Sequence, residues 1–139
     1  MEEGSIFGVI PSAIGSLETL QILDLEQNNF SGTIPEEIYV LSNLIELDLS
    51  KNKLTGMLSS QVGNLASLNT LQLNNNLLLG TIPKEVGQLE QLENGYFSYN
   101  NFTGQVLAEI CDLQTEGSLD VLQVDCLSEV SCDCCTSCS

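Results

Sequence analysis

Six cysteines give this chain most of its capacity for chemistry, and all of them follow residue 110. They are Cys111, Cys126, Cys132, Cys134, Cys135 and Cys138. The last four could bind zinc as thiolates, but zinc sites usually combine two separated cysteine pairs or add histidine, and the chain has no histidine. We therefore predict disulfides formed in an oxidising compartment, with no metal and no cofactor. The sequence does not choose among the possible pairings.

The other reactive residue types do not form a catalytic pattern. Without histidine, neither a Ser-His nor a Cys-His nucleophile pair can exist. Carboxylates are plentiful, but Asp24 and Asp48 each stand between two leucines and are expected on a solvated face. Neither a glycine-rich phosphate loop nor an EF-hand pattern occurs. We expect no enzyme activity and name no catalytic residue.

The charge of the chain restricts its partners. The formal net charge is −16, and the positive residues are only Lys51, Lys53 and Lys84. Such a chain is unsuited to nucleic acid or to anionic membranes, which both require Lys and Arg. Long-range attraction would favour basic partners, although acidity also serves solubility alone. No apolar stretch is long enough to insert into a membrane.

The elements that must position these residues are repeats with a period of 24 residues. One copy has leucine at 41, 44, 47, 49 and 54, asparagine at 52 and glycine at 56. Similar copies begin at Leu17, Leu65 and Leu89. The Leu-x-Leu pair predicts a short strand with alternate side chains pointing inward. A single copy cannot bury enough apolar surface to fold alone, so the copies must stack.

An asparagine follows each predicted strand at the same phase, namely Asn28, Asn52, Asn76 and Asn100. Its amide can both donate to and accept from backbone groups left unpaired by a bend. Stacking would place the four asparagines in a structural ladder. Two of the neighbouring residues, Asn29 and Asn101, begin N-x-S/T sequons, which are either glycosylation sites or a consequence of the repeat consensus.

The repeats resemble the plant-type class of leucine-rich repeat proteins, which continue after the asparagine with Gly-x-Ile-Pro. Gly32-Thr-Ile-Pro35 and Gly80-Thr-Ile-Pro83 match this motif, and Ser59 and Leu107 depart from it at the proline. The resemblance implies an α/β repeat fold. This fold is a right-handed solenoid with a parallel sheet on the concave face and few regular helices. Receptor ectodomains and polygalacturonase-inhibitor-like proteins belong to this family.

The predicted domain organisation is leucine-rich repeats over 1–112 and a disulfide-rich C-terminal cap over 113–139. The first repeat is partial, because residues 4 to 16 match only the second half of a copy. This favours a fragment of a longer protein, although a minimal N-terminal cap is the alternative. A last strand is expected near 118–122, with Cys126 in the phase of Phe102. The tail is similar to cysteine-rich ends of some algal proteins of this family.

Binding is expected on the concave face, where side chains between the inward leucines form rows. The predicted ligand-binding residues are Ile22, Asp24, Glu26, Glu46, Asp48, Thr70, Gln72, Asn94, Tyr96, Ser98 and Tyr99. Tyrosine suits recognition because it combines apolar area with a polar tip. Tyr96 and Tyr99 could instead cover a defect at Gly95, which replaces an inward leucine and should make the fourth strand the least regular.

The predicted function is therefore non-enzymatic binding of a protein, peptide or glycan by a secreted or cell-surface protein. Structural or adhesive roles and inhibition of wall-degrading enzymes are alternatives. Ice binding is the weakest alternative, because Met57 and Gln105 interrupt a row that contains Thr33 and Thr81. The sequence defines neither the ligand nor the oligomeric state.

Overall fold

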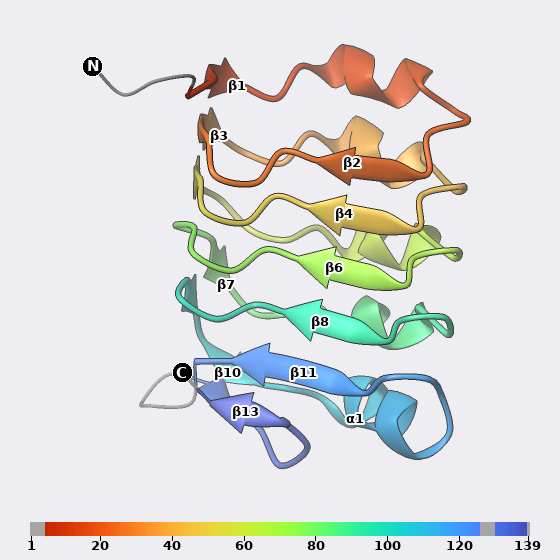
Figure 1. The fold of residues 1–139 in the computed structure, drawn as a ribbon. Coiled ribbons are helices and arrows are strands. Elements are labelled where there is room, and N and C mark those ends of the chain that lie inside the picture. The colour runs from red at the N-terminus through yellow and green to blue at the C-terminus, as the bar shows by residue number, and fades with distance from the viewer. Residues whose placement is uncertain (1–4, 126–129, 139) are drawn as a thin grey trace.

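The computed structural model describes residues 5–125 and 130–138 and shows a right-handed solenoid of stacked coils (Figure 1). Parallel strands form its main sheet, and short helices form the opposite side. The order across the main sheet is β13-β11-β8-β6-β4-β2. Its strands are β2 (Ile22–Asp24), β4 (Glu46–Asp48), β6 (Thr70–Gln72), β8 (Asn94–Tyr96), β11 (Val121–Val124) and β13 (Ser137–Cys138).

A second set of short parallel strands runs along one side of the solenoid and pairs coil to coil. These strands are β1 (Phe7–Val9), β3 (Asn29–Gly32), β5 (Lys53–Leu54), β7 (Leu79–Gly80), β9 (Asn101–Phe102), β10 (Gly104–Gln105) and β12 (Val130–Ser131). They form the sheets β1-β3-β5, β7-β9 and β10-β12. This side corresponds to the Gly-x-Ile-Pro segment of each repeat.

The remaining side consists of one short helix per coil. Four are 3-10 helices: η1 (Ser12–Ser16), η2 (Glu36–Val40), η3 (Ser60–Asn64) and η4 (Lys84–Gln88). The α-helix α1 (Ala108–Thr115) takes this place in the last coil. Proline precedes η1, η2 and η4 as the N-cap residue. Ser59 replaces it before η3, where its hydroxyl accepts a hydrogen bond from the Gln61 amide.

The core is a column of leucines contributed once per coil. The strand residues Leu23, Leu47, Leu71 and Gly95 lie in register, and Leu122 of β11 continues their row. Burial is nearly complete in the central coils, where Leu47 and Leu71 are at most 1% exposed. The predicted inward alternation of the Leu-x-Leu strands is therefore observed.

The asparagine ladder joins successive coils. In each case the side-chain oxygen accepts a backbone amide of the preceding coil, as Asn76 does from Leu54 at 3.0 Å. In Asn52, Asn76 and Asn100 the side-chain nitrogen also donates to carbonyls of both coils, for Asn76 to Leu49 at 2.9 Å and Leu73 at 3.1 Å. The residue before each asparagine is left-handed, with φ between 55° and 58° at Gln27, Lys51, Asn75 and Tyr99.

The expectation that Gly95 weakens the fourth strand was wrong. Strand β8 has three residues, as do β2, β4 and β6, and it pairs with both β6 and β11. A Cβ at Gly95 would lie 3.0 Å from the ring of Phe97 and 3.5 Å from Leu122. These two apolar side chains therefore fill the space that an inward leucine would occupy.

The position predicted for the last strand was shifted. Strand β11 covers Val121–Val124 and so only partly overlaps the predicted range 118–122, and Leu122 aligns with Gly95. The longer helix α1 occupies this coil in place of a 3-10 helix, so additional residues separate the two strands. The proposed boundary between residues 112 and 113 falls inside α1, and this division of the chain remains a proposal.

Within the described part of the chain, two disulfides hold the C-terminal cap. Cys111 on α1 is bonded to Cys134, and Cys132 is bonded to Cys135. Among the described residues no cysteine is free. Cys126 and the side chain of Cys138 lie outside the described part, so their predicted pairing is not addressed. The Cys111–Cys134 disulfide connects the segment after β12 to the last helix of the solenoid, and Cys132–Cys135 closes a short loop within that segment.

Candidate functional site

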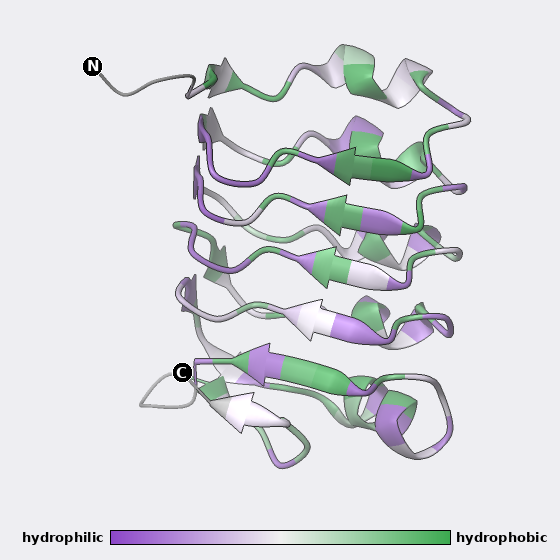
Figure 2. Cartoon of the chain, in the orientation of Figure 1, coloured by the Kyte–Doolittle hydropathy of each residue, from purple (hydrophilic) through white to green (hydrophobic). Residues whose placement is uncertain are grey.

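The concave face is the outer surface of the main sheet, and its side chains lie in two rows. Residues aligned in the first row are Ile22, Glu46, Thr70, Asn94 and Val121; those in the second are Asp24, Asp48, Gln72, Tyr96 and Gln123. In Figure 2 strand β2 is mostly green (hydrophobic) and strand β8 is white to purple (hydrophilic), since Gly95 takes the place of the inward Leu23. The sheet therefore brings most of the predicted binding residues onto one surface.

Two predicted binding residues are not available to a ligand. Ser98 is 1% exposed and Asp48 is 6% exposed. Strand β8 ends at Tyr96, so outward alternation stops there and Ser98 turns into the interior. Asp48 is covered by the next coil, since its carboxylate accepts hydrogen bonds from the Ser50 amide at 2.8 Å and from Gln72 Nε2 at 2.7 Å. Both side chains are buried beneath the concave face and cannot contact a ligand on it.

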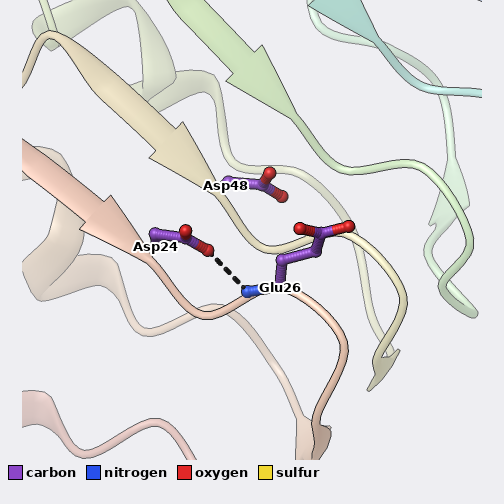
Figure 3. Close-up of side chains that lie close together, drawn as sticks. All are labelled: Asp24, Glu26 and Asp48. Atoms are coloured by element: carbon purple, nitrogen blue, oxygen red, sulfur yellow. Dashed lines mark hydrogen bonds between the residues drawn. The ribbon is translucent and has the colours of Figure 1, made fainter.

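Acidic groups gather at the first two strands (Figure 3). The carboxylates of Asp24, Glu26 and Asp48 offer oxygens that lie within 4.8 Å of one another. Asp24 accepts the Glu26 amide at 2.9 Å, and Glu26 pairs with Lys51 Nζ at 2.7 Å. This hydrogen bond raises the pKa of Lys51. The three carboxylates have the spacing of cation ligands, but each already accepts a hydrogen bond from an amide or an amine of the chain itself.

The two tyrosines of the fourth repeat lie at the opposite end of this surface. Tyr96 is half-buried in the second row, and Tyr99 is 59% exposed on the bend that follows. The Tyr99 amide donates to Asp125 Oδ1 at 2.7 Å, and the Asn100 amide donates to Asp125 Oδ2 at 3.0 Å. Asp125 thus replaces the carbonyls that a further repeat would offer. The sequence did not identify Asp125, because the last coil departs from the 24-residue period and the repeat phase therefore does not indicate where Asp125 lies.

A second surface, which we call the lateral face, contains the threonine row on which the weak sequence-based case for ice binding rests. It consists of the outward residues beside the second set of strands: Phe7, Val9, Asn29, Ser31, Thr33, Lys53, Thr55, Met57, Leu77, Leu79, Thr81, Asn101, Thr103 and Gln105. None is acidic, although the chain has 19 Asp and Glu residues. Phe7, Val9, Met57, Leu77 and Leu79 are exposed large hydrophobics. A search of the sequence for repeat positions that never contain Asp or Glu would have identified the full extent of this surface.

Glycines lie beneath side chains of the lateral face. Gly32, Gly56, Gly80 and Gly104 have φ between 75° and 90°. The side chain of the preceding coil lies over each glycine, and a Cβ at Gly56 would be 2.8 Å from Thr33 Cγ2. Both sequon asparagines, Asn29 and Asn101, also lie on this face. A glycan at either position would cover part of it.

Comparison with known proteins agrees with this architecture. The leucine rich repeat family model matches residues 18–78. Residues 18–78 belong to the leucine-rich repeat family, and the chain has the fold of a leucine-rich repeat solenoid. No curated protein sequence gives a significant match. Among the described residues of this solenoid, no helix has the length and apolar character needed to cross a bilayer.

Several solved plant structures contain a similar solenoid. A plant ice-binding protein is 30% identical with a TM-score of 0.76, and the match covers 91% of this chain and 39% of that protein. The plant peptide hormone receptor RGFR1, in complex with RGF2, is 33% identical with a TM-score of 0.82, and the match covers 92% of this chain and 23% of that receptor. The Arabidopsis receptor kinase HAESA, in complex with the peptide hormone IDA and the co-receptor SERK1, is 38% identical with a TM-score of 0.79. The match covers 87% of this chain and 20% of that structure. The chain therefore spans well under half of each of these structures.

Proposed function

We propose that the chain is an extracellular, non-enzymatic binding module that recognises a protein, peptide or glycan ligand through its concave face. The receptors RGFR1 and HAESA, which have similar solenoids, were solved with peptide hormones. This likeness supports a binding role and favours a peptide or protein over a glycan. Disulfides in the cap agree with secretion or display at a cell surface, since they persist in oxidising compartments.

The observation that carries this proposal is the availability of Tyr96. Phe97 and Leu122 fill the space beside Gly95, so the tyrosine is not needed as a plug. Its side chain lies in an in-register row on a rigid parallel sheet. Aromatic side chains held in such arrays contribute a large share of binding energy at interfaces. A partner that covers this part of the sheet would bury the ring of Tyr96.

The charge gradient along the face favours one orientation of the ligand. Asp24, Glu26 and Glu46 lie at the first two strands, where Lys51 is the nearby positive side chain. Neutral residues and the tyrosines occupy the later strands. We therefore expect the basic part of a ligand at the first coils and an apolar part at Tyr96. The acidic end should affect association rate more than dissociation.

The test is a screen of synthetic peptides and cell-wall oligosaccharides against the immobilised protein, followed by titration of each hit. Tyr96→Ala should weaken a true ligand by at least tenfold. Tyr99→Asn is the second variant, because asparagine tolerates the left-handed backbone at this position better than alanine does. Gln105→Ala on the lateral face is the control and should leave affinity unchanged. Hits that bind both tyrosine variants normally, with the fold intact, would contradict the proposal.

Two further roles would use the same surface differently. An inhibitor of wall-degrading enzymes would place the concave face against an enzyme, and the titration would then identify a protein ligand. A structural or adhesive solenoid would need no specific ligand, and the screen would give no saturable hit.

Ice binding is a second candidate, favoured by the lateral face. The residues that define this surface recur from coil to coil and include no acidic residue, and a plant ice-binding protein has a similar solenoid. Hydroxyl and apolar side chains both occur on it, and successive coils are separated by the spacing of parallel strands, about 4.8 Å. Met57 interrupts the threonine row of this face. This interruption is a weaker argument against ice binding than the sequence suggested, because the exposed methionine keeps the face apolar.

Ice recrystallisation and thermal hysteresis assays distinguish this candidate from the concave-face proposal. Thr55→Glu places a charge on the lateral face, and Thr70→Glu places the same charge on the concave face. Activity that is lost only in Thr55→Glu would support ice binding. Absence of activity in the unmodified protein would remove this candidate.

A further inference from the structure

One of the four 3-10 helices lacks the glycine that the other three have at the same phase. Gly15, Gly63 and Gly87 share a phase at which the next helix approaches closely. A Cβ at Gly63 would lie 2.9 Å from the carbonyl oxygen of Glu85, and one at Gly87 would meet that of Glu109. Tyr39 occupies this phase in η2. A tyrosine can be accommodated there only if η3 stands away from η2.

The tyrosine is buried and its hydroxyl is not hydrogen-bonded. Tyr39 is 2% exposed, and its oxygen has no hydrogen-bond partner. Burial raises the pKa of this phenol, the nearby backbone amide of Ser59 lowers it, and the charge of Glu36 raises it further. The ring therefore extends from the end of η2 toward the start of η3. It acts as a spacer between the two helices.

A hollow of about 650 Å³ opens on the surface beside this spacer. Two carboxylates, Glu36 and Glu37, line it together with apolar groups that include Pro35, Met57 and Pro83. The Ser59 hydroxyl donates to Glu36 Oε2 at 2.9 Å and fixes this carboxylate in the wall. No lysine is among the lining residues. The hollow thus combines negative charge with apolar walls.

We infer that this hollow binds an organic cation with an apolar stem, such as the side chain of arginine or lysine. Glu36 and Glu37 would bind the charged group, since a guanidinium or ammonium donates its hydrogen bonds to carboxylates. Met57 and the two prolines would contact the methylene stem, as apolar surfaces do for long basic side chains. Tyr39 is a positioning residue that keeps the hollow open. This site is separate from the concave face, so it does not depend on the function proposed above.

The test is an NMR titration of the folded protein with three small probes. N-acetylarginine amide carries the charged side chain, and N-acetylcitrulline amide is a neutral analogue of nearly the same shape. Agmatine has the guanidinium without a peptide-like backbone. We expect saturable shifts at the amides of Glu36, Met57 and Ser60 with arginine amide and not with the citrulline analogue. Binding of agmatine alone would identify a free small cation, and binding of both would indicate a side chain of a partner.

Variants separate a built site from general attraction to an acidic chain. Glu36→Gln should weaken the arginine probe at least fivefold. Glu90→Gln removes the same charge from a different hollow, beside α1, and should leave affinity unchanged. Tyr39→Gly should close the hollow and abolish binding, and Tyr39→Phe should preserve it because the ring remains. If Tyr39→Gly does not fold, the comparison of Glu36→Gln with Glu90→Gln still tests whether the hollow binds the probe. Equal weakening by Glu36→Gln and Glu90→Gln, or no saturable shift, would overturn the inference.

Discussion

Replacing Asn76 by alanine tests how the ladder stabilises the solenoid. Asn76 is 6% exposed, and its side-chain oxygen is the hydrogen-bond partner of the buried Leu54 amide. The carbonyls of Leu49 and Leu73 would each keep a second asparagine donor, from Asn52 and Asn100. The substitution therefore leaves one buried donor unpaired. Such a group costs about 1–3 kcal/mol, so we expect a loss of about 2 kcal/mol in the free energy of unfolding.

The ladder supplies its own control series. Asn28 makes the same kind of bond to the Ile6 amide, but in an exposed setting. Water can replace the lost partner there, and Asn28→Ala should cost about 0.5 kcal/mol. Asn52→Ala should fall between the two, because its bond to the Phe30 amide is part-buried. Asn43 lies outside the ladder and makes one exposed bond to the Glu18 carbonyl, so Asn43→Ala should have little effect.

Urea unfolding followed by circular dichroism measures these differences, with the slope compared among variants to confirm that the unfolding reaction is unchanged. The order of destabilisation should be Asn76, Asn52 and then Asn28. The reasoning would be refuted if Asn28→Ala and Asn76→Ala lowered stability equally, since burial of the unpaired amide would then not be the cause.

Three other perturbations give definite expectations. Asp125→Ala should destabilise the last coil by about 1–2 kcal/mol, seen as faster hydrogen exchange at the Tyr99 and Asn100 amides, with Asp133→Ala as control. Alkylation of the native protein should find no free thiol, and reduction should open α1 before the central coils because energy in a solenoid is local. Stability should be full below about pH 10 and fall as pH rises, because burial raises the pKa of Tyr39 while the unfolded chain ionises near 10.0; Tyr39→Phe should reduce this fall.

The sequence alone determined the solenoid because its information is periodic. Leucine pairs at a fixed spacing specify inward strand positions, and an asparagine in constant phase specifies the bend. The aligned rows of the main sheet, from Ile22 to Asn94 and from Asp24 to Tyr96, also follow from the repeat. Cysteine density predicted the disulfide-held cap. Each of these features repeats along the chain or depends on composition, so it does not require knowledge of distant contacts.

The tertiary structure decided whatever departs from the period. Burial of Asp48 depends on Gln72 of the next coil, and the filling of the space at Gly95 depends on Leu122 of the cap. The register of β11 depends on the length of α1, and the spacing of η2 and η3 depends on where the Tyr39 ring lies. A repeat pattern reports what each coil has in common. Contacts between coils that differ are set by packing, and packing is decided only when the coils are stacked.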